Sequence, residues 1–215
     1  MLKVIKKIVK RSPFYIVLRR CLEISKQARE VRAWERNGSP APPPHIIKQQ
    51  TLLEYSRRYG LKVLVETGTF QGDMVEAMRT KFERIFSIEL SNDLYEKARI
   101  KFAAYKHIEI IHGDSAAQLV KVLAQLERPA LFWLDGHYSA GITARGAKDT
   151  PIMEELQHIL DAENGGQVMI IDDARCFGTN PAYPTIEQVK CFIRSKRKDV
   201  EIIIRHDSIR VAPKG

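Results

Sequence analysis

The fold is decided by the stretch Lys62-Val-Leu-Val-Glu-Thr-Gly-Thr-Phe-Gln-Gly-Asp73. Its apolar run, Val63–Val65, leads to a carboxylate at Glu66. Two glycines, Gly68 and Gly72, follow before helix-forming residues take over. This order predicts a strand, a tight glycine turn and a helix. Glycine removes the Cβ where the chain bends off the strand and where a ligand approaches the backbone, so the stretch predicts a cradle for a nucleotide-like ligand.

Strand and helix patterns alternate on both sides of this stretch. Continuous apolar runs such as Leu131–Leu134 and Val168–Ile171 predict strands that are buried on both faces, which is typical of a parallel, doubly wound sheet. Only His206 and Asp207 separate the last two strands, which leaves room for a hairpin but not for a crossover helix, so the last strand is antiparallel. We predict a Rossmann-like α/β fold with helices between the first six of seven strands, at about 62–67, 84–89, 107–112, 130–135, 167–172, 200–205 and 208–212.

Length and composition predict one core domain with an appended arm. The chain has 215 residues, of which 44% are hydrophobic and 28% charged, as in a globular protein. We expect a basic helical arm at 1–37, a proline-rich linker at 38–44 and the domain at 45–215, which opens with a helix over 45–59. The first 40 residues hold 11 basic and three acidic residues, a net +8 of the total +9, so the basic charge belongs to the arm.

The arm alternates apolar and basic residues, but its apolar runs are too short to span a bilayer, and it lacks a signal-peptide core with a cleavage site. One interpretation is an interfacial helix that contacts anionic lipid at the inner face of the membrane. The other is a helix that packs on its own core or on a second subunit of a homo-oligomer. Three cysteines without paired short spacing favour neither disulfides nor zinc, so we expect a cytoplasmic protein.

Acidic residues recur where successive predicted strands end. Glu66 and its glycines form E-x-G-x-x-x-G, which departs from the dinucleotide fingerprint G-x-G-x-x-G. Glu89 ends the second strand, where a carboxylate accepts hydrogen bonds from ribose hydroxyls, and Asp114 follows the third, where it can accept from an exocyclic amine. The alternative is that these carboxylates are solvated strand ends in a sheet that binds something else.

Over residues 45–215 the chain resembles the class I S-adenosylmethionine-dependent methyltransferases. The resemblance is carried by V-E-T-G-T-F-Q-G at 65–72, F-S-I-E-L at 86–90 and G-D-S at 113–115. It implies S-adenosylmethionine as the methyl donor. The residues it implies for the methionine moiety are Glu66, Thr67, Gly68 and Gly72, with Glu89 for the ribose and Asp114 and Ser115 for the adenine.

Three further carboxylates follow the fourth and fifth predicted strands: Asp135, Asp172 and Asp173. Carboxylates that converge on one cleft repel one another unless a proton or a cation lies among them, and oxygen ligands favour Mg²⁺, Mn²⁺ or Ca²⁺. The pattern resembles the metal-dependent O-methyltransferases of the catechol and macrolide-sugar type, in which acidic residues at these places hold a divalent ion. The catechol enzymes usually have Asp-Asn where this chain has Asp172-Asp173.

The segment after Asp135 is a glycine-rich connection, 136–151, that is long for a strand-to-helix loop. His137 is a candidate general base beside Asp135, and alternatively a metal ligand or a structural histidine. The loop resembles those of bacterial methyltransferases associated with sugar or polysaccharide modification. It is either a substrate loop, with Tyr138, Arg145 and Lys148 toward the acceptor and the two basic residues meeting an acidic group, or a solvated loop.

Three functions remain open on these observations. The first is an O-methyltransferase acting on a small hydroxylated molecule or a sugar, with S-adenosylmethionine and a divalent ion. The second is an RNA or DNA methyltransferase, which the basic arm favours; against it, the fourth strand is followed by Asp-Gly-His-Tyr rather than an Asn-Pro-Pro-Tyr-like motif, and no Pro-Cys nucleophile occurs. The third is a non-catalytic cofactor-fold protein tethered by its arm. Cys176, Cys191 and His206 are interpreted as structural.

Overall fold

The structure, a computed structural model, describes residues 13–136, 150–162 and 165–214. The chain divides into two compact units, Met1–Lys48 and Gln49–Gly215. The division falls within helix α3 (His45–Arg58), which follows the proline-rich stretch. The arm, linker and domain boundaries taken from composition therefore stay a prediction.

The first unit contains helix α2 (Pro13–Arg36). Proline suits the first position of a helix, because its missing N–H would have no partner there. After the helix ends, the chain turns through Gly38, with φ 81°, and the indole of Trp34 donates a hydrogen bond to the carbonyl of Pro40 over 2.7 Å. Within the described ranges, no helix is long and apolar enough to cross a membrane.

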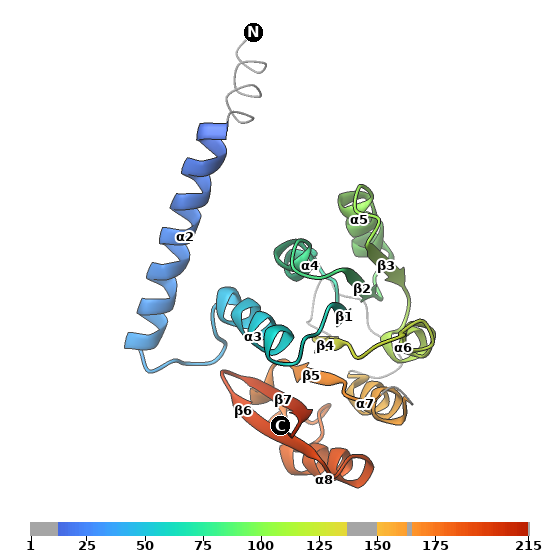
Figure 1. Ribbon diagram of the computed structural model, residues 1–215. Coiled ribbons are helices and arrows are strands. Elements are labelled where there is room, and N and C mark those ends of the chain that lie inside the picture. The colour runs from blue at the N-terminus through green and yellow to red at the C-terminus, as the bar shows by residue number, and fades with distance from the viewer. Residues whose placement is uncertain (1–12, 137–149, 163–164, 215) are drawn as a thin grey trace. The chain divides into compact units, whose positions relative to one another are not determined.

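The second unit is built on a seven-stranded sheet in the order β3-β2-β1-β4-β5-β7-β6 (Figure 1). Strands β1 to β5 pair in parallel, and β7 runs antiparallel to both β5 and β6. The predicted fold class is confirmed. The strands are β1 (Val63–Thr67), β2 (Arg84–Glu89), β3 (Ile108–His112), β4 (Leu131–Leu134), β5 (Val168–Ile171), β6 (Val200–Arg205) and β7 (Ser208–Pro213).

Helices cover both faces of the sheet, as the continuous apolar strands predict. Along β4, Phe132 packs in the core beneath α6, α7 and α8, whereas Trp133 packs in the core beneath α3, α4 and α5. Each face thus has its own apolar layer. The helices are α4 (Asp73–Met78), α5 (Asn92–Phe102), α6 (Ser115–Leu123), α7 (Ile152–Asp161) and α8 (Ile186–Lys196), with a short 3-10 helix η1 (Ala174–Cys176) after β5.

The terminal hairpin also has the predicted form. His206 and Asp207 connect β6 to β7 and both take left-handed backbone conformations, with φ 48° and 59°. Positive φ at both central residues is the geometry of a tight two-residue hairpin turn, which aspartate tolerates better than most side chains. The turn lies at the same edge of the sheet as the carboxyl end of β5, because β6 runs parallel to β5.

Candidate functional site

The predicted site residues within the described ranges lie at one edge of the sheet, at the carboxyl ends of the parallel strands. Parallel strands bring their ends to the same edge, where ligands bind in sheets of this class. The structure places there the ends of β1 (Glu66, Thr67, Gly68) and β2 (Glu89), and the residues after β3 (Asp114, Ser115), β4 (Asp135) and β5 (Asp172, Asp173).

Gly68 is required by its contact with the chain that follows β4. Its φ is 86°, and a Cβ placed on it would lie 2.5 Å from the carbonyl oxygen of Asp135. We predicted a close approach of a ligand to this backbone; the structure adds a close approach of the protein's own backbone. Gly72, with φ 71°, is restricted by the ring of Phe102, which a Cβ would meet at 2.7 Å. The absence of a side chain at these two positions therefore lets the end of β1 pack against the chain after β4, and the start of α4 against the end of α5.

Glu66 is a buried carboxyl with a hydroxyl network. The Ser87 hydroxyl donates a short hydrogen bond to its Oε2, and the hydroxyls of Ser87 and Thr69 lie 2.6 Å apart. Burial raises the pKa of Glu66 to about 8, and the hydrogen bond from Ser87 opposes that rise. Sequence reasoning missed Ser87; the available signal was a polar residue inside the apolar strand R-I-F-S-I-E.

Glu89 connects the end of β2 to the loop after β1. The backbone N–H of Phe70 donates to its Oε2 over 2.7 Å, and the N–H of Ser91 donates to its Oε1 over 2.8 Å. Asp114 likewise has a structural contact, because its carboxylate caps α6 by accepting from Ala117 N–H over 3.1 Å. Both carboxylates are thus oriented by the backbone, and each oxygen keeps lone pairs for a ligand.

Asp135, Asp172 and Asp173 converge as predicted. Each offers a carboxylate oxygen, and these oxygens lie within 4.8 Å of one another. Asp172 and Asp173 are buried, and Asp173 takes a left-handed conformation with φ 55°. Arg175 forms an ion pair with Asp173 over 2.7 Å, a contact for which the sequence carried no signal.

A fourth carboxyl, Glu155 of α7, reaches the same region and was missed by sequence reasoning. A Cβ on Gly136 would lie 3.2 Å from both Glu155 Oε1 and Thr67 Oγ1, so the three residues meet. Burial raises the pKa of Glu155 to about 7, while the nearby hydroxyls of Ser115 and Thr67 oppose the rise. The signal was a carboxyl on the apolar stripe of a helix, between Ile152 and Ile159.

Glu155 also lines a small hollow between the ends of β4 and β5. The carboxyls of Asp135 and Asp172 line the same hollow, together with the side chains of Thr150 and Tyr183. Burial raises the pKa of the Tyr183 hydroxyl, so this group stays protonated and able to donate. The hollow is small, about 10 Å³, which is room for about one water molecule or a single hydroxyl group, and the polar part of its lining offers both acceptors and donors.

Four predicted residues lie outside the described residues: His137, Tyr138, Arg145 and Lys148. Their roles as base and as substrate-loop residues therefore stay predictions. The structure describes the two ends of their loop, at Gly136 and Thr150, and both of these line the hollow. Cys176 and Cys191 have free thiols.

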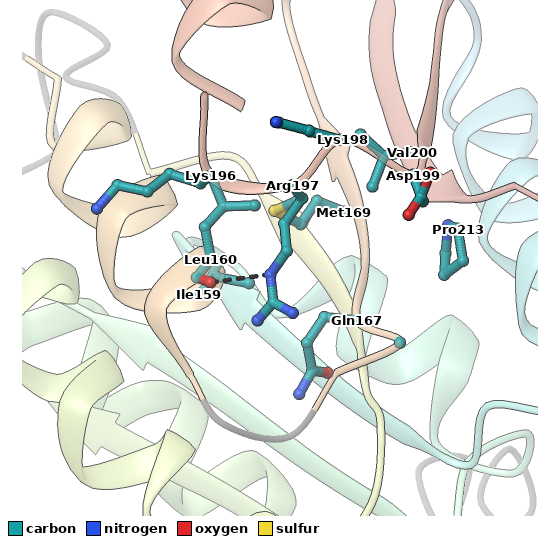
Figure 2. Close-up of a pocket in the computed structure, with 11 residues that line it drawn as sticks. Ile159, Leu160, Gln167, Met169, Lys196, Arg197, Lys198, Asp199, Val200 and Pro213 are labelled. Carbon is teal, nitrogen blue, oxygen red and sulfur yellow. Dashed lines mark hydrogen bonds between the residues drawn. The ribbon is translucent and has the colours of Figure 1, made fainter. Parts of the chain in front are cut away.

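A second pocket, of about 280 Å³, lies at the opposite edge of the sheet. Figure 2 shows the Arg197 guanidinium inside it, with a hydrogen bond from Nε to the Leu160 carbonyl over 3.1 Å. Its Nη2 donates to the carbonyl of Ala162 over 2.8 Å. Gln167 is similarly engaged, because its side-chain oxygen accepts from the backbone of Ala130. These groups satisfy the backbone, so we place the candidate site at the carboxyl edge.

No family model matches the chain, and no curated protein sequence matches it either. Solved structures do resemble it. The O-methyltransferase from Bacillus cereus, solved with S-adenosylhomocysteine, is 14% identical, with a TM-score of 0.58 over 99% of this chain and 97% of its own. TomG, the O-methyltransferase of tomaymycin synthesis from Streptomyces achromogenes, solved with S-adenosylmethionine, is 18% identical, with a TM-score of 0.57 over 87% and 89%.

A third similar structure is a putative rRNA methylase from Clostridium thermocellum, which is 12% identical and has a TM-score of 0.56 over 77% of this chain and 95% of its own. The likeness thus extends to structures named for different acceptors, and at these identities it concerns the fold. In this chain the sheet has seven strands, and its β7 is antiparallel, as the sequence predicted. The chain has the fold of the class I S-adenosylmethionine-dependent methyltransferases.

Proposed function

We propose that this protein is an S-adenosylmethionine-dependent O-methyltransferase that acts on a small hydroxylated molecule or a sugar, assisted by a divalent ion. One observation carries the proposal. The acidic residues at the carboxyl ends of β1 and β2 and after β3 lie at the same edge of the sheet as the converging carboxylates after β4 and β5. The first group suits the methyl donor and the second suits the acceptor.

For the donor, the proposal assigns the ribose hydroxyls to Glu89 and the adenine to Asp114 and Ser115. Two hydrogen bonds from the backbone hold the Glu89 carboxylate, so it is oriented before the ligand arrives. The methionine moiety falls to Glu66, Thr67 and the glycine turn. Glu66 is protonated near pH 7 in the free protein, so a ligand ammonium nearby favours release of its proton.

For the ion, the carboxylates after β4 and β5 have suitable chemistry. Oxygens of Asp135, Asp172 and Asp173 lie within 4.8 Å of one another, and hard oxygen donors suit Mg²⁺, Mn²⁺ or Ca²⁺. These residues would hold the ion, and when bound it would lower the pKa of an acceptor hydroxyl. The protein's own contribution is to orient the acceptor and to limit its contact with water.

Transfer to a hydroxyl also requires a proton acceptor and in-line positioning of the acceptor oxygen. S-adenosylmethionine supplies an electrophilic methyl group on a sulfonium. We assign the base to His137, two residues after Asp135, and the alignment of the acceptor to Tyr138 and the hollow at Thr150 and Tyr183. Arg145 and Lys148 would meet an acidic group on the acceptor.

The test is calorimetric titration of the full chain with S-adenosylhomocysteine, with and without Mg²⁺, followed by methyl transfer to a panel of polyhydroxylated acceptors. We expect saturable binding without the ion, and transfer that a chelator reduces at least about tenfold. The variants Asp135→Ala and Asp172→Ala should still bind S-adenosylhomocysteine, but should lose the part of the methyl transfer that a chelator suppresses. Failure of the wild-type protein to bind S-adenosylhomocysteine would overturn the proposal.

Two observations keep a nucleic-acid acceptor as the second candidate: the net +8 of the first 40 residues and the likeness to the rRNA methylase fold. RNA methylation that falls with rising salt, without transfer to small acceptors, would favour it. A membrane contact of the arm is a separate proposal. It predicts that the full chain sediments with anionic vesicles but not with neutral ones.

A further inference from the structure

Asp173 is a nearly buried carboxylate with a basic partner beside it. Its side chain is 7% exposed, and it follows Asp172 directly at the end of β5. Arg175 Nη1 contacts Asp173 Oδ1 over 2.7 Å. At this distance the guanidinium engages Asp173 Oδ1 in a charge-assisted hydrogen bond, although the Arg175 side chain itself is 40% exposed to water. Asp173 is therefore already paired with a cation of the protein.

The terminal hairpin holds that guanidinium in place. Asp207, in the turn between β6 and β7, forms a second, shorter ion pair with Arg175 Nη1, and its side chain is only 2% exposed. Its Oδ1 also accepts from Arg175 N–H over 2.8 Å, and its backbone carbonyl accepts from Ala174 N–H over 2.8 Å. Asp207 thus binds both the backbone and the side chain of Arg175.

This chain has Asp172-Asp173 where the catechol-type enzymes that the sequence resembles usually have Asp-Asn. The contact with Arg175 involves Asp173, the residue that differs. Arg175 shares its single positive charge between Asp173 and Asp207, so it offsets only part of the Asp173 charge that a neighbouring ion would meet, whereas a neutral asparagine carries no charge. Arg175 therefore engages one oxygen of the additional carboxylate and offsets its charge in part. This contact comes from Arg175 of η1, which Asp207 of the hairpin turn holds in place. The sequence connects neither element to the strand ends.

We propose that Arg175, held by Asp207, is a positioning residue that keeps Asp173 engaged, so that a divalent ion is bound by Asp135 and Asp172. The inference rests on the metal part of the proposed function and narrows it from three carboxylates to two. A purely structural Arg175 would only fasten the loop after β5. The two readings differ in what they predict for ion affinity.

The experiment is calorimetric titration of the chelator-treated full chain with Mn²⁺, with thermal unfolding of every variant as a check on folding. Asp172→Asn should weaken Mn²⁺ binding at least about tenfold, because it removes a charged ligand. Asp173→Asn should stay within about threefold of wild type. Arg175→Gln should bind about tenfold more tightly, because it exposes the Asp173 charge to the ion.

The double variant Asp173→Asn/Arg175→Gln should return to the wild-type affinity, because both charges are removed together. Lys196→Gln is the matched control. Lys196 pairs with Asp161 at the opposite edge, so its loss removes one positive charge and should leave Mn²⁺ affinity unchanged.

Two results would overturn the inference alone: an Asp173→Asn loss as large as that of Asp172→Asn, or an Arg175→Gln affinity equal to wild type. Absence of Mn²⁺ binding by a wild-type protein that binds S-adenosylhomocysteine would overturn the inference together with the metal part of the proposed function. Absence of S-adenosylhomocysteine binding would overturn the proposed function itself. The four outcomes are distinguishable in one set of titrations.

Discussion

Polar side chains have different surroundings at the two edges of the sheet. At the carboxyl edge, Glu66 and Glu155 are buried carboxyls whose pKa values burial raises to about 8 and about 7. At the amino edge, Arg197 donates from Nε and Nη2 to carbonyls at the end of α7 (Figure 2). The amino-edge pocket is large, but its guanidinium stabilises the backbone. Burying a carboxyl group is unfavourable, and the carboxyl edge contains two such groups. Unfavourable burial of this kind is typical of functional sites.

The larger of the two pockets lies at the amino edge, so the size of a pocket and the chemistry of its lining point to different edges of the sheet. The carboxyl edge is distinguished by buried polar atoms that lack a well-formed hydrogen bond. Among the described residues, Thr67 Oγ1 and Glu155 Oε1 are buried side-chain oxygens without a well-formed hydrogen bond. Such atoms reduce stability unless a ligand or water completes them.

The largest expected effect is that of Gly68→Ala at the carboxyl edge. The new Cβ would lie 2.5 Å from the Asp135 carbonyl oxygen, at a φ of 86° that alanine rarely adopts. We expect a loss of about 2–5 kcal/mol in the free energy of unfolding and at least ~100-fold in S-adenosylhomocysteine affinity. Chemical denaturation and calorimetry measure the two quantities.

Gly60→Ala is the matched control for backbone strain. Gly60 also has a positive φ, 66°, but a Cβ there would have no atom within 4 Å. We expect a loss of about 1 kcal/mol and unchanged ligand affinity. Equal effects of the two substitutions would show that the contact with Asp135 is unimportant, and would break the comparison.

The second prediction concerns the pH dependence of stability. In the unfolded chain Glu66 ionises near its ordinary pKa of 4.5, whereas in the folded protein it keeps its proton to about pH 8. Unfolding between these values releases a proton, so stability falls as pH rises through this window. The variant Glu66→Gln has no titrating group at this position, so it should not lose stability in this way. Its stability relative to wild type should therefore increase by up to about 1.4 kcal/mol for each pH unit from 5 to 8.

Urea denaturation at several pH values measures this difference. Glu155→Gln should show the same trend over a narrower window that ends near pH 7, since the pKa of Glu155 is lower. Stability curves of wild type and Glu66→Gln that stay parallel from pH 5 to 8 would contradict the raised pKa. Calorimetry in buffers of different ionisation enthalpy should also detect release of up to one proton when wild type binds S-adenosylhomocysteine at pH 7, and none with Glu66→Gln.

The smallest effect is expected at the amino edge. Arg197→Gln removes hydrogen bonds to the carbonyls of Leu160 and Ala162, and with them a positive charge beside the end of α7. We expect a loss of about 1–2 kcal/mol in stability and unchanged S-adenosylhomocysteine affinity. The exposed neighbour Lys198→Ala should change stability by less than about 0.5 kcal/mol. A weaker affinity for the ligand in Arg197→Gln would remove the distinction between the edges.

Much of the fold was predictable from the sequence. Buried parallel strands are continuous apolar runs, and the two residues between β6 and β7 exclude a crossover, so local patterns carried the sheet and its last turn. The positions of the candidate donor residues were also predictable, because Glu66, Glu89 and Asp114 lie at the carboxyl end of a strand or just after it. Topology alone brings such residues together.

The contacts within the site were not predictable in this way. Ser87 lies 21 residues after Glu66, and Asp207 lies 32 residues after Arg175, with no pattern to connect either pair. Glu155 occupies a core position of α7, where its meaning depends on which strand ends the helix covers. Such contacts depend on the side chains of separate elements, whose distances only the packing of the sheet and helices sets.

The sequence by itself determined the order of strands and helices and the acidic residues at strand ends, because both follow from local periodicity and from the shared direction of parallel strands. Tertiary structure alone decided the protonation of Glu66 and Glu155, since burial in the folded protein sets their pKa values. It also decided that Asp207 pairs with Arg175, because only the folded sheet brings the hairpin turn and η1 together.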